Sequence, residues 1–119
     1  MREERIIYID PLTISREGFQ RIIEAHNSSV GHEVVASVRS IHDLNRLAIE
    51  DLKPTVAVIG DMVGLEQGEL SAKRLRETFP GITVVAFTLH GEKVPWADHT
   101  FDVLTPAKKV VSFFTNLEH

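Results

Sequence analysis

The feature that most limits the fold is a short, uniformly apolar run in the middle of the chain. It spans residues 55–59 (Thr-Val-Ala-Val-Ile) and leads directly into Gly60 and Asp61. An uninterrupted run of this length is typical of a strand that is buried on both faces, as in the centre of a parallel sheet. In an open α/β sheet, the residues just beyond the carboxyl end of a central strand line the crevice where ligands bind. The function of the chain therefore depends on Gly60 and Asp61.

The composition and charge indicate one globular domain that does not itself bind nucleic acid. The chain has 119 residues, of which 43% are hydrophobic, so it is long enough to bury a core. Its formal net charge of −4 argues against a nucleic-acid-binding face, because such domains usually carry a clustered basic surface. The absence of cysteine excludes disulfides, thiolate chemistry and cysteine-based zinc sites.

No targeting or anchoring signal is visible in the sequence. It has no apolar run of about 18 residues, no signal peptide and no lipidation motif, so we expect a cytoplasmic location and no membrane partner. The final Leu117-Glu118-His119 resembles the remainder of a cloning scar and a histidine tag. We therefore assign the domain to residues 1–116 and expect it to come from a longer protein.

Apolar runs and helical periodicities alternate along the chain. The patterns predict strands at residues 5–9, 34–38, 55–59, 82–87 and 101–104. They predict helices at residues 13–26, 41–51, 69–79 and 106–117, the last with Pro106 at its first position. Residues 89–100 contain Gly91 and Pro95 and show no helical period, so a loop or a shortened helix is expected there.

This alternation predicts an α/β fold. Strands that are separated by helices pair in parallel through right-handed crossovers. The economical arrangement is a three-layer, doubly wound, flavodoxin-like sheet of five parallel strands in the order 2-1-3-4-5. A flavin site does not fit, because residues 10–13 in the first loop lack a phosphate cradle rich in glycine, serine and threonine.

Five segments in a characteristic order carry a further pattern that spans nearly the whole chain. They are Asp10, residues 16–19 (Arg-Glu-Gly-Phe), residues 53–59 (Lys-Pro-Thr-Val-Ala-Val-Ile), residues 74–88, and residues 104–106 (Leu-Thr-Pro). Together they resemble the CheY-like receiver domain of bacterial response regulators, particularly receivers linked to a helix-turn-helix output domain. The resemblance implies two-component signal transduction and transcription regulation through an output domain absent from this chain. It also places Gly68 at the family's loop glycine.

The resemblance implies a phosphorylation chemistry from which this chain departs. Receivers bind Mg²⁺ through two acidic residues after strand one and an aspartate after strand three, which accepts the phosphoryl group. A lysine and a Ser/Thr contact that group. Here Asp10 and Thr88 are present, but Pro11 replaces the second acid, Gly60 the phosphoacceptor and Thr105 the lysine. We therefore expect a degenerate phosphorylation pocket with no catalytic residue, since the charges that stabilise phosphoryl transfer are missing.

Asp61 leaves an alternative open. A one-residue slip turns a strand side chain to the opposite face, so we expect Asp61 to point away from Asp10 and to cap the following loop. A bulge could re-aim it. Asp61 would then be a phosphoacceptor and, with Asp10, a ligand of Mg²⁺. A third hypothesis is a small-molecule sensor whose crevice is formed by Asp10, Thr88 and Thr105.

Aromatic residues are the candidates for protein contacts. Trp96, in the irregular loop, is either a lid over the sheet edge or an exposed anchor. Phe101 on the last strand is a further candidate, and Phe114 on the last helix is expected to lie partly outside the core, in a dimer contact. No two of the six histidines have the spacing of a helical metal site, so no metal or cofactor is expected. The sequence thus predicts a non-enzymatic pseudo-receiver that binds a protein partner or a second copy of itself, and that reaches DNA only through its output domain.

Overall fold

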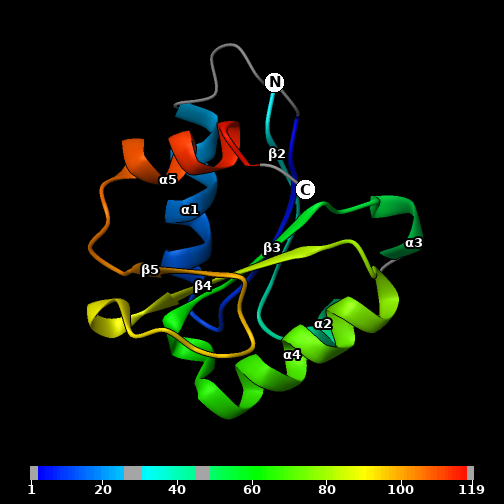
Figure 1. Cartoon of the computed structure of the whole chain (residues 1–119). Coiled ribbons are helices and arrows are strands. Elements are labelled where there is room, and N and C mark those ends of the chain that lie inside the picture. Colours follow the sequence, from blue (N-terminus) through cyan, green and yellow to red (C-terminus); the bar gives the residue numbers. More distant parts are fainter. Residues whose placement is uncertain (1–2, 26–30, 45–48, 118–119) are drawn as a thin grey trace.

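The computed structural model describes residues 3–25, 31–44 and 49–117, and these form a single five-stranded sheet (Figure 1). The strands are β1 (Arg5–Ile9), β2 (Glu33–Val38), β3 (Val56–Ile59), β4 (Thr83–Thr88) and β5 (His99–Asp102). All neighbouring strands pair in parallel, in the order β2-β1-β3-β4-β5. The predicted flavodoxin-like fold and the order 2-1-3-4-5 are confirmed.

Helices cover both faces of the sheet (Figure 1). They are α1 (Thr13–Ala25), α2 (Ile41–Leu44), α3 (Ile49–Leu52), α4 (Leu65–Thr78) and α5 (Ala107–Thr115), with 3₁₀ turns η1 (Asp61–Val63) and η2 (Leu89–Gly91). Between β4 and β5 the chain forms only the turn η2, which confirms that the helix expected there is shortened or replaced by a loop. None of the helices in the described residues is long and apolar enough to cross a membrane.

The alternation of side chains along the strands separates two apolar layers. In β1, Ile7 and Ile9 join the cluster beneath α2 and α4, whereas Ile6 and Tyr8 join the cluster beneath α1 and α5. Every residue of β3 is buried, as expected for the central strand. This strand therefore delivers Gly60 to the middle of the sheet's carboxyl edge.

The predicted start of the third helix and the predicted end of the last strand were wrong. The helix expected from residue 69 begins at Leu65, so Gly68 is a helical glycine and not a loop glycine. A Cβ atom at Gly68 would lie 2.7 Å from the ring of Trp96, so the packing of Trp96 leaves no room for a side chain at position 68. The last strand ends at Asp102, two residues early, because the Asp102 carboxylate accepts the backbone N–H of Leu104 at 2.8 Å and turns the chain.

Two predicted helices also differ in detail. The helix expected over residues 41–51 is represented by the short helices α2 and α3, and residues 45–48 between them lie outside the described residues. Pro106 is the N-cap of α5, because its ψ of 143° is extended, and the first helical residue is Ala107.

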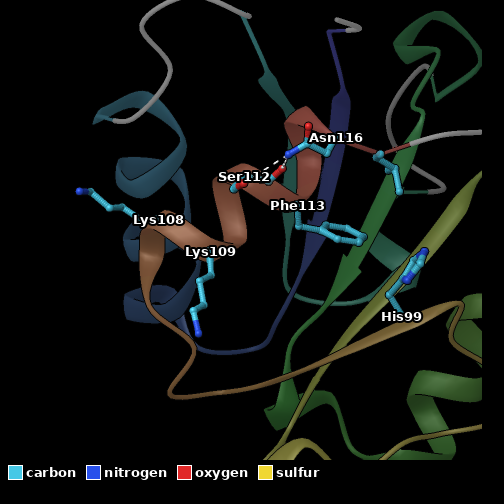
Figure 2. A pocket seen from close by; sticks show the side chains of 7 residues that line it. His99, Lys108, Lys109, Ser112, Phe113 and Asn116 are labelled. Carbon is cyan, nitrogen blue, oxygen red and sulfur yellow. Dashed lines mark hydrogen bonds between the residues drawn. The ribbon is translucent and has the colours of Figure 1, made fainter.

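The aromatic side chains of α5 divide between core and surface. Phe114 is 0% exposed and packs edge-on against Phe19 of α1, with ring centroids 6.2 Å apart. The expectation that Phe114 lies partly outside the core was therefore wrong, and Phe113 is the half-buried member of the pair. The ring of Phe113 contacts the rings of His99 and Phe101. Phe113 and His99 line a shallow groove beside α5 (Figure 2).

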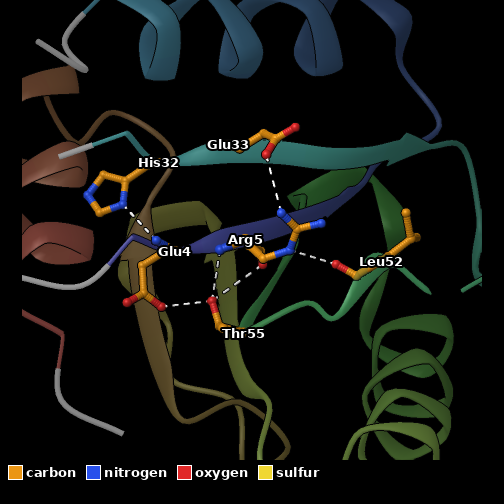
Figure 3. A network of polar contacts seen from close by, with 6 residues as sticks. All are labelled: Glu4, Arg5, His32, Glu33, Leu52 and Thr55. Atoms are coloured by element: carbon orange, nitrogen blue, oxygen red, sulfur yellow. Dashed lines mark hydrogen bonds and ion pairs between the residues drawn. The ribbon is translucent and has the colours of Figure 1, made fainter. Parts of the chain in front are cut away.

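A buried carboxylate lies at the amino edge of the sheet (Figure 3). Glu4 is 1% exposed, and its Oε1 accepts a 2.8 Å hydrogen bond from the hydroxyl of Thr55. Its backbone N–H donates to Nδ1 of His32 at 3.0 Å, and Nε2 of His32 lies 3.2 Å from the hydroxyl of Thr115 on α5. The network thus ties β1 to β3, to the start of β2 and to the last helix.

Arg5 closes the same network on its exposed side (Figure 3). Its Nε donates to the carbonyl of Leu52 at 2.7 Å, and its guanidinium lies 3.3 Å from the carboxylate of Glu33. The backbone N–H of Arg5 donates to the Thr55 hydroxyl at 2.9 Å. Arg5 therefore connects β1 to the segment before β3, through Leu52 and Thr55, and to β2, through Glu33.

Candidate functional site

The parallel pairing brings four of the predicted site residues to the carboxyl edge of the sheet. Asp10 directly follows β1, Gly60 and Asp61 follow β3, and Thr88 ends β4. The strands β1, β3 and β4 are neighbours, with Ile9 opposite Ile59 and Ile59 opposite Ala86. Residues that directly follow these strands must therefore lie close together.

Asp10 is a buried carboxyl group with one unpartnered oxygen. The residue is 1% exposed; Oδ1 accepts the backbone N–H of Leu12 at 2.9 Å, whereas Oδ2 is buried with no hydrogen-bond partner. Burial raises the pKa of Asp10, and the charge of Asp61 raises it further, against the opposing effects of the Leu12 N–H, of the Tyr8 hydroxyl and of Arg16. Burial therefore makes ionisation of Asp10 less favourable than it is in water.

Gly60 approaches Asp10 more closely than any other residue type could. A Cβ atom at this position would lie 1.9 Å from Oδ2 of Asp10 and 2.7 Å from its carboxyl carbon. The φ of Gly60 is −71°, so the requirement for glycine comes from space and not from backbone conformation. The Asp10 carboxyl group fills the volume that a side chain at position 60 would need.

The direction of the Asp61 side chain relative to Asp10 stays a prediction, but the strand rule on which it was based does not hold at this residue. Strand β3 ends at Ile59, and Asp61 is the first residue of η1, so the alternation rule for strands no longer applies to it. Its charge contributes to the raised pKa values of Asp10 and Tyr8, for both of which burial is the larger cause. Asp61 is half-buried and lines a cavity together with Gly60 and Thr88.

Arg16 is a site residue that the sequence patterns did not reveal. Its guanidinium donates a 2.9 Å hydrogen bond to the backbone carbonyl of Asp10, and its charge opposes the rise in the Asp10 pKa. In sequence it stands on the polar side of α1, where a solvated arginine is the usual interpretation. Its position in the first turn of the helix after Asp10 was the available signal.

The cavity at this edge has a volume of about 240 Å³. Its walls come from the ends of β3 and β4, from η1 and η2, from the start of α4 and from the β4–β5 loop. The lining residues are Gly60, Asp61, Met62, Gly64, Leu65, Phe87, Thr88, Leu89, Glu92, Val94 and Trp96. Apolar side chains thus dominate the walls, and Asp61 and Glu92 are the ionisable groups that the described part of the chain contributes to them.

Solved structures resemble this chain over almost its whole length. The receiver domain of RcsB from Salmonella enterica serovar Typhimurium superimposes with a TM-score of 0.69, at 15% identity over 99% of this chain and 93% of its own. A LuxR-family two-component response regulator from Aurantimonas sp. SI85-9A1 gives 0.72, at 20% identity over 95% and 83%. A CheY-like receiver domain protein from Methanospirillum hungatei JF-1 gives 0.72, at 14% identity over 95% and 91%.

The fold is that of a response-regulator receiver domain. No protein-family model matches the sequence, and no curated protein matches it significantly. The likeness therefore rests on three-dimensional structure.

Thr88, Pro11 and Thr105, three of the predicted pocket residues, differ in how they are placed in this fold. Thr88 lines the cavity, but its hydroxyl donates a 2.8 Å hydrogen bond to the backbone carbonyl of Glu92. Pro11 is exposed, and Thr105, whose N–H donates to the Asp102 carbonyl, is not among the residues that line the cavity. Of the predicted pocket residues, Gly60, Asp61 and Thr88 thus line the cavity, and Asp10 lies against Gly60.

Trp96 is half-buried and covers α4 of the receiver fold at Gly68. The backbone carbonyl of Trp96 accepts a 2.7 Å hydrogen bond from Arg76, whose guanidinium also pairs with Asp98 at 3.1 Å. This geometry favours the interpretation of Trp96 as a lid over that of a free anchor. Phe101 is half-buried beside Phe87 and Phe113.

Proposed function

We propose that this chain is a pseudo-receiver, a receiver domain that works without phosphorylation as a protein-interaction or dimerisation module in two-component signalling. The observation that supports this most is the approach of Gly60 to Asp10. An aspartate at position 60 would need the space that the Asp10 carboxyl group occupies, since even a Cβ atom would lie 1.9 Å from Oδ2. A phosphoacceptor at this point of the edge is therefore incompatible with the observed position of Asp10.

Among the described residues, the cavity at this edge is lined by none of the cations that phosphoryl transfer needs, and Arg16, which contacts Asp10, is not part of its lining. Catalysis of this reaction depends on cations placed around the transferred group. The cavity beside Gly60 has carboxylates, Asp61 and Glu92, and no basic residue in its lining. The position of the family's lysine is Thr105, whose hydroxyl carries no charge. We therefore propose that the domain has no enzymatic activity of its own.

The carboxylates present do not fit a Mg²⁺ site well. Magnesium ions bind oxygen ligands with near-octahedral geometry and keep several waters. The unpartnered oxygen of Asp10 is buried against Gly60, and burial raises the pKa of this carboxyl group, which disfavours the charged form that a cation needs. Among the residues that the structure describes, no group of three or more His, Cys, Asp or Glu side chains is placed to hold a metal ion.

The structural neighbours support a role in controlling a DNA-binding output. One of them is the RcsB response regulator bound to the promoter rprA, and the present chain covers 60% of it, at 11% identity. Another is described as a LuxR-family regulator. We propose that the present domain likewise regulates a DNA-binding domain outside this chain, from the cytoplasm and without a direct DNA contact.

Treatment with acetyl phosphate and Mg²⁺ tests the loss of phosphorylation. Intact-mass spectrometry should show an unchanged mass, while a receiver with a complete set of acidic residues, treated in parallel, gains a phosphoryl group. A labile phosphoryl adduct on this chain would overturn the proposal.

A phosphorylatable receiver that uses Asp61 is the second candidate, because Asp61 acts electrostatically on Asp10. In that case the mass gain should disappear in Asp61→Asn and persist in Glu17→Gln, a change at an exposed carboxylate on α1. A mass gain that survives Asp61→Asn would exclude this assignment as well.

The contact surface that we propose lies on β5 and α5, around the half-buried rings of Phe101 and Phe113. Strand β5 is at the edge of the sheet, and edge strands carry unpaired backbone groups that a second chain can meet. Sedimentation velocity should show a concentration-dependent dimer that Phe101→Ser weakens and Leu12→Ser, a change at an exposed side chain of the β1–α1 loop, does not. A strictly monomeric chain would leave a heterologous partner as the remaining form of this proposal.

A further inference from the structure

The cavity at the carboxyl edge has a chemistry that phosphate does not explain. Among the residues that the structure describes, its lining includes two acidic residues, Asp61 and Glu92, and no Lys, Arg or His. An anion such as phosphate would be repelled there. A cation with an apolar body would instead meet opposite charge at one end and apolar walls at the other.

The indole ring of Trp96 strengthens the preference for a cation. Trp96 and Phe87 both line the cavity, but they pack on opposite faces of the sheet, and the ring of Phe87 lies 5.8 Å from that of Phe101. The faces of aromatic rings carry negative electrostatic potential and attract ammonium groups, tryptophan most strongly. Carboxylates together with aromatic faces form the combination that distinguishes an organic ammonium from a neutral or anionic molecule of the same shape.

The size and the rim of the cavity limit the ligand further. The volume of about 240 Å³ lies below the range of roughly 300–1,000 Å³ that drug-sized ligands occupy. Met62, Leu65 and Leu89 line the cavity and are 53%, 66% and 59% exposed, so they form an apolar rim that is open to water. An apolar ligand body at this rim would remove that surface from water.

We infer that this edge binds a small organic cation, an ammonium group joined to a short apolar body. The inference rests on the proposed function only in that the edge is free of phosphoryl chemistry. Asp61 and Glu92 would pair with the ammonium group, Trp96 would contact it through its ring, and Leu65 and Leu89 would cover the apolar body. The domain would then respond to ligand occupancy in place of phosphorylation.

Trp96 is the only tryptophan in the sequence, so its fluorescence reports directly on this cavity. Titration with n-hexylamine, 1-hexanol and hexanoate at neutral pH compares one apolar body with three charge states. The amine should change the Trp96 emission at a concentration at least tenfold lower than the alcohol, and hexanoate should bind weakest. Equal responses to the three compounds, or no response to any of them, would overturn the inference.

Substitutions identify the groups responsible. Asp61→Asn should weaken amine binding about tenfold or more and leave alcohol binding within about twofold, since only the charge is removed. Glu92→Gln should have the same sign of effect, and Glu17→Gln on the exposed side of α1 should match the parent chain. An amine preference that survives both Asp61→Asn and Glu92→Gln would contradict the assignment. No phosphodonor is present in these titrations, so their failure is distinct from a failure of the phosphorylation test.

Discussion

The amino and carboxyl edges of the sheet each contain a buried carboxyl group, and the two groups differ in their hydrogen bonding. Glu4 at the amino edge and Asp10 at the carboxyl edge are both 1% exposed. Glu4 accepts a hydrogen bond from Thr55 and sits in a network that extends through His32 to α5. Asp10 keeps an oxygen without a hydrogen-bond partner, pressed against the backbone of Gly60.

The difference shows which edge is arranged for stability. Burying a polar group is tolerable when hydrogen bonds compensate for lost water, and costs free energy when they do not. The amino edge meets this condition, so its polar residues are explained by folding alone. The carboxyl edge does not meet it, and it also carries the apolar cavity. An arrangement that costs stability at the edge where parallel sheets bind ligands indicates function.

The largest expected effect comes from filling the space between Gly60 and Asp10. Gly60→Ala should lower the free energy of unfolding by about 1–3 kcal/mol, because the new methyl group collides with a buried carboxyl group. Urea denaturation measures this. Gly81→Ala is the matched control, since a Cβ atom there meets nothing within 4 Å. Combining Gly60→Ala with Asp10→Ala should recover part of the loss, and a purely additive double mutant would contradict the collision.

The next largest effect should come from removing the hydrogen bond between Thr55 and Glu4 at the amino edge. Thr55→Val keeps the side-chain shape but removes the hydroxyl group that donates to Glu4. We expect a loss of about 1–2 kcal/mol in the free energy of unfolding, because a buried carboxylate oxygen loses its donor. Thr78→Val, at an exposed position late in α4, is the control. Equal effects of the two substitutions would mean that the network contributes little to stability.

Acid should weaken the amino edge through His32. Burial lowers the pKa of His32, against the opposing charges of Glu4 and Glu3. The unfolded chain, with a histidine pKa near 6.5, therefore binds the proton before the native chain does. Stability from this residue is complete above about pH 6.5 and falls as the pH drops through the lowered native pKa, by less than about 1.4 kcal/mol per pH unit. Denaturation of the parent chain and of His32→Gln between pH 7 and 5 should show a shallower slope for the variant.

The smallest effect should be a gain in stability when Asp10 at the carboxyl edge is replaced. The pKa of Asp10 is raised mainly by burial, so its contribution to stability is complete below the ordinary aspartate pKa and is lost as the pH rises through the native value. Asp10→Asn, which stays neutral, should therefore raise the free energy of unfolding at pH 7 by up to about 1 kcal/mol, with a smaller gain in acid. A gain that does not change with pH would show that the ionisation of Asp10 is not the cause.

The sheet could be predicted from sequence because its signals are local. Apolar runs such as residues 55–59 and the periodic helices between them determine strand number and order. The site depends on contacts between residues distant in sequence, which no local pattern encodes. Gly60 lies against Asp10, and Gly68 lies beneath Trp96, because there is no room for a side chain at either position. The sequence does not distinguish a glycine required by such a contact from a glycine required by a turn. The same limit affected Asp61, whose direction depends on where β3 gives way to η1.

The hydrogen bond from the hydroxyl of Thr88 to the carbonyl of Glu92 has a consequence for how such a domain could be controlled. A hydroxyl group held by its own loop gains little by rotating toward a new partner. If the domain works as proposed, occupancy by a ligand or by a second chain sets its output, and occupancy follows from concentration and affinity. The control then lies with the rates at which the cell makes and removes this protein and its ligand.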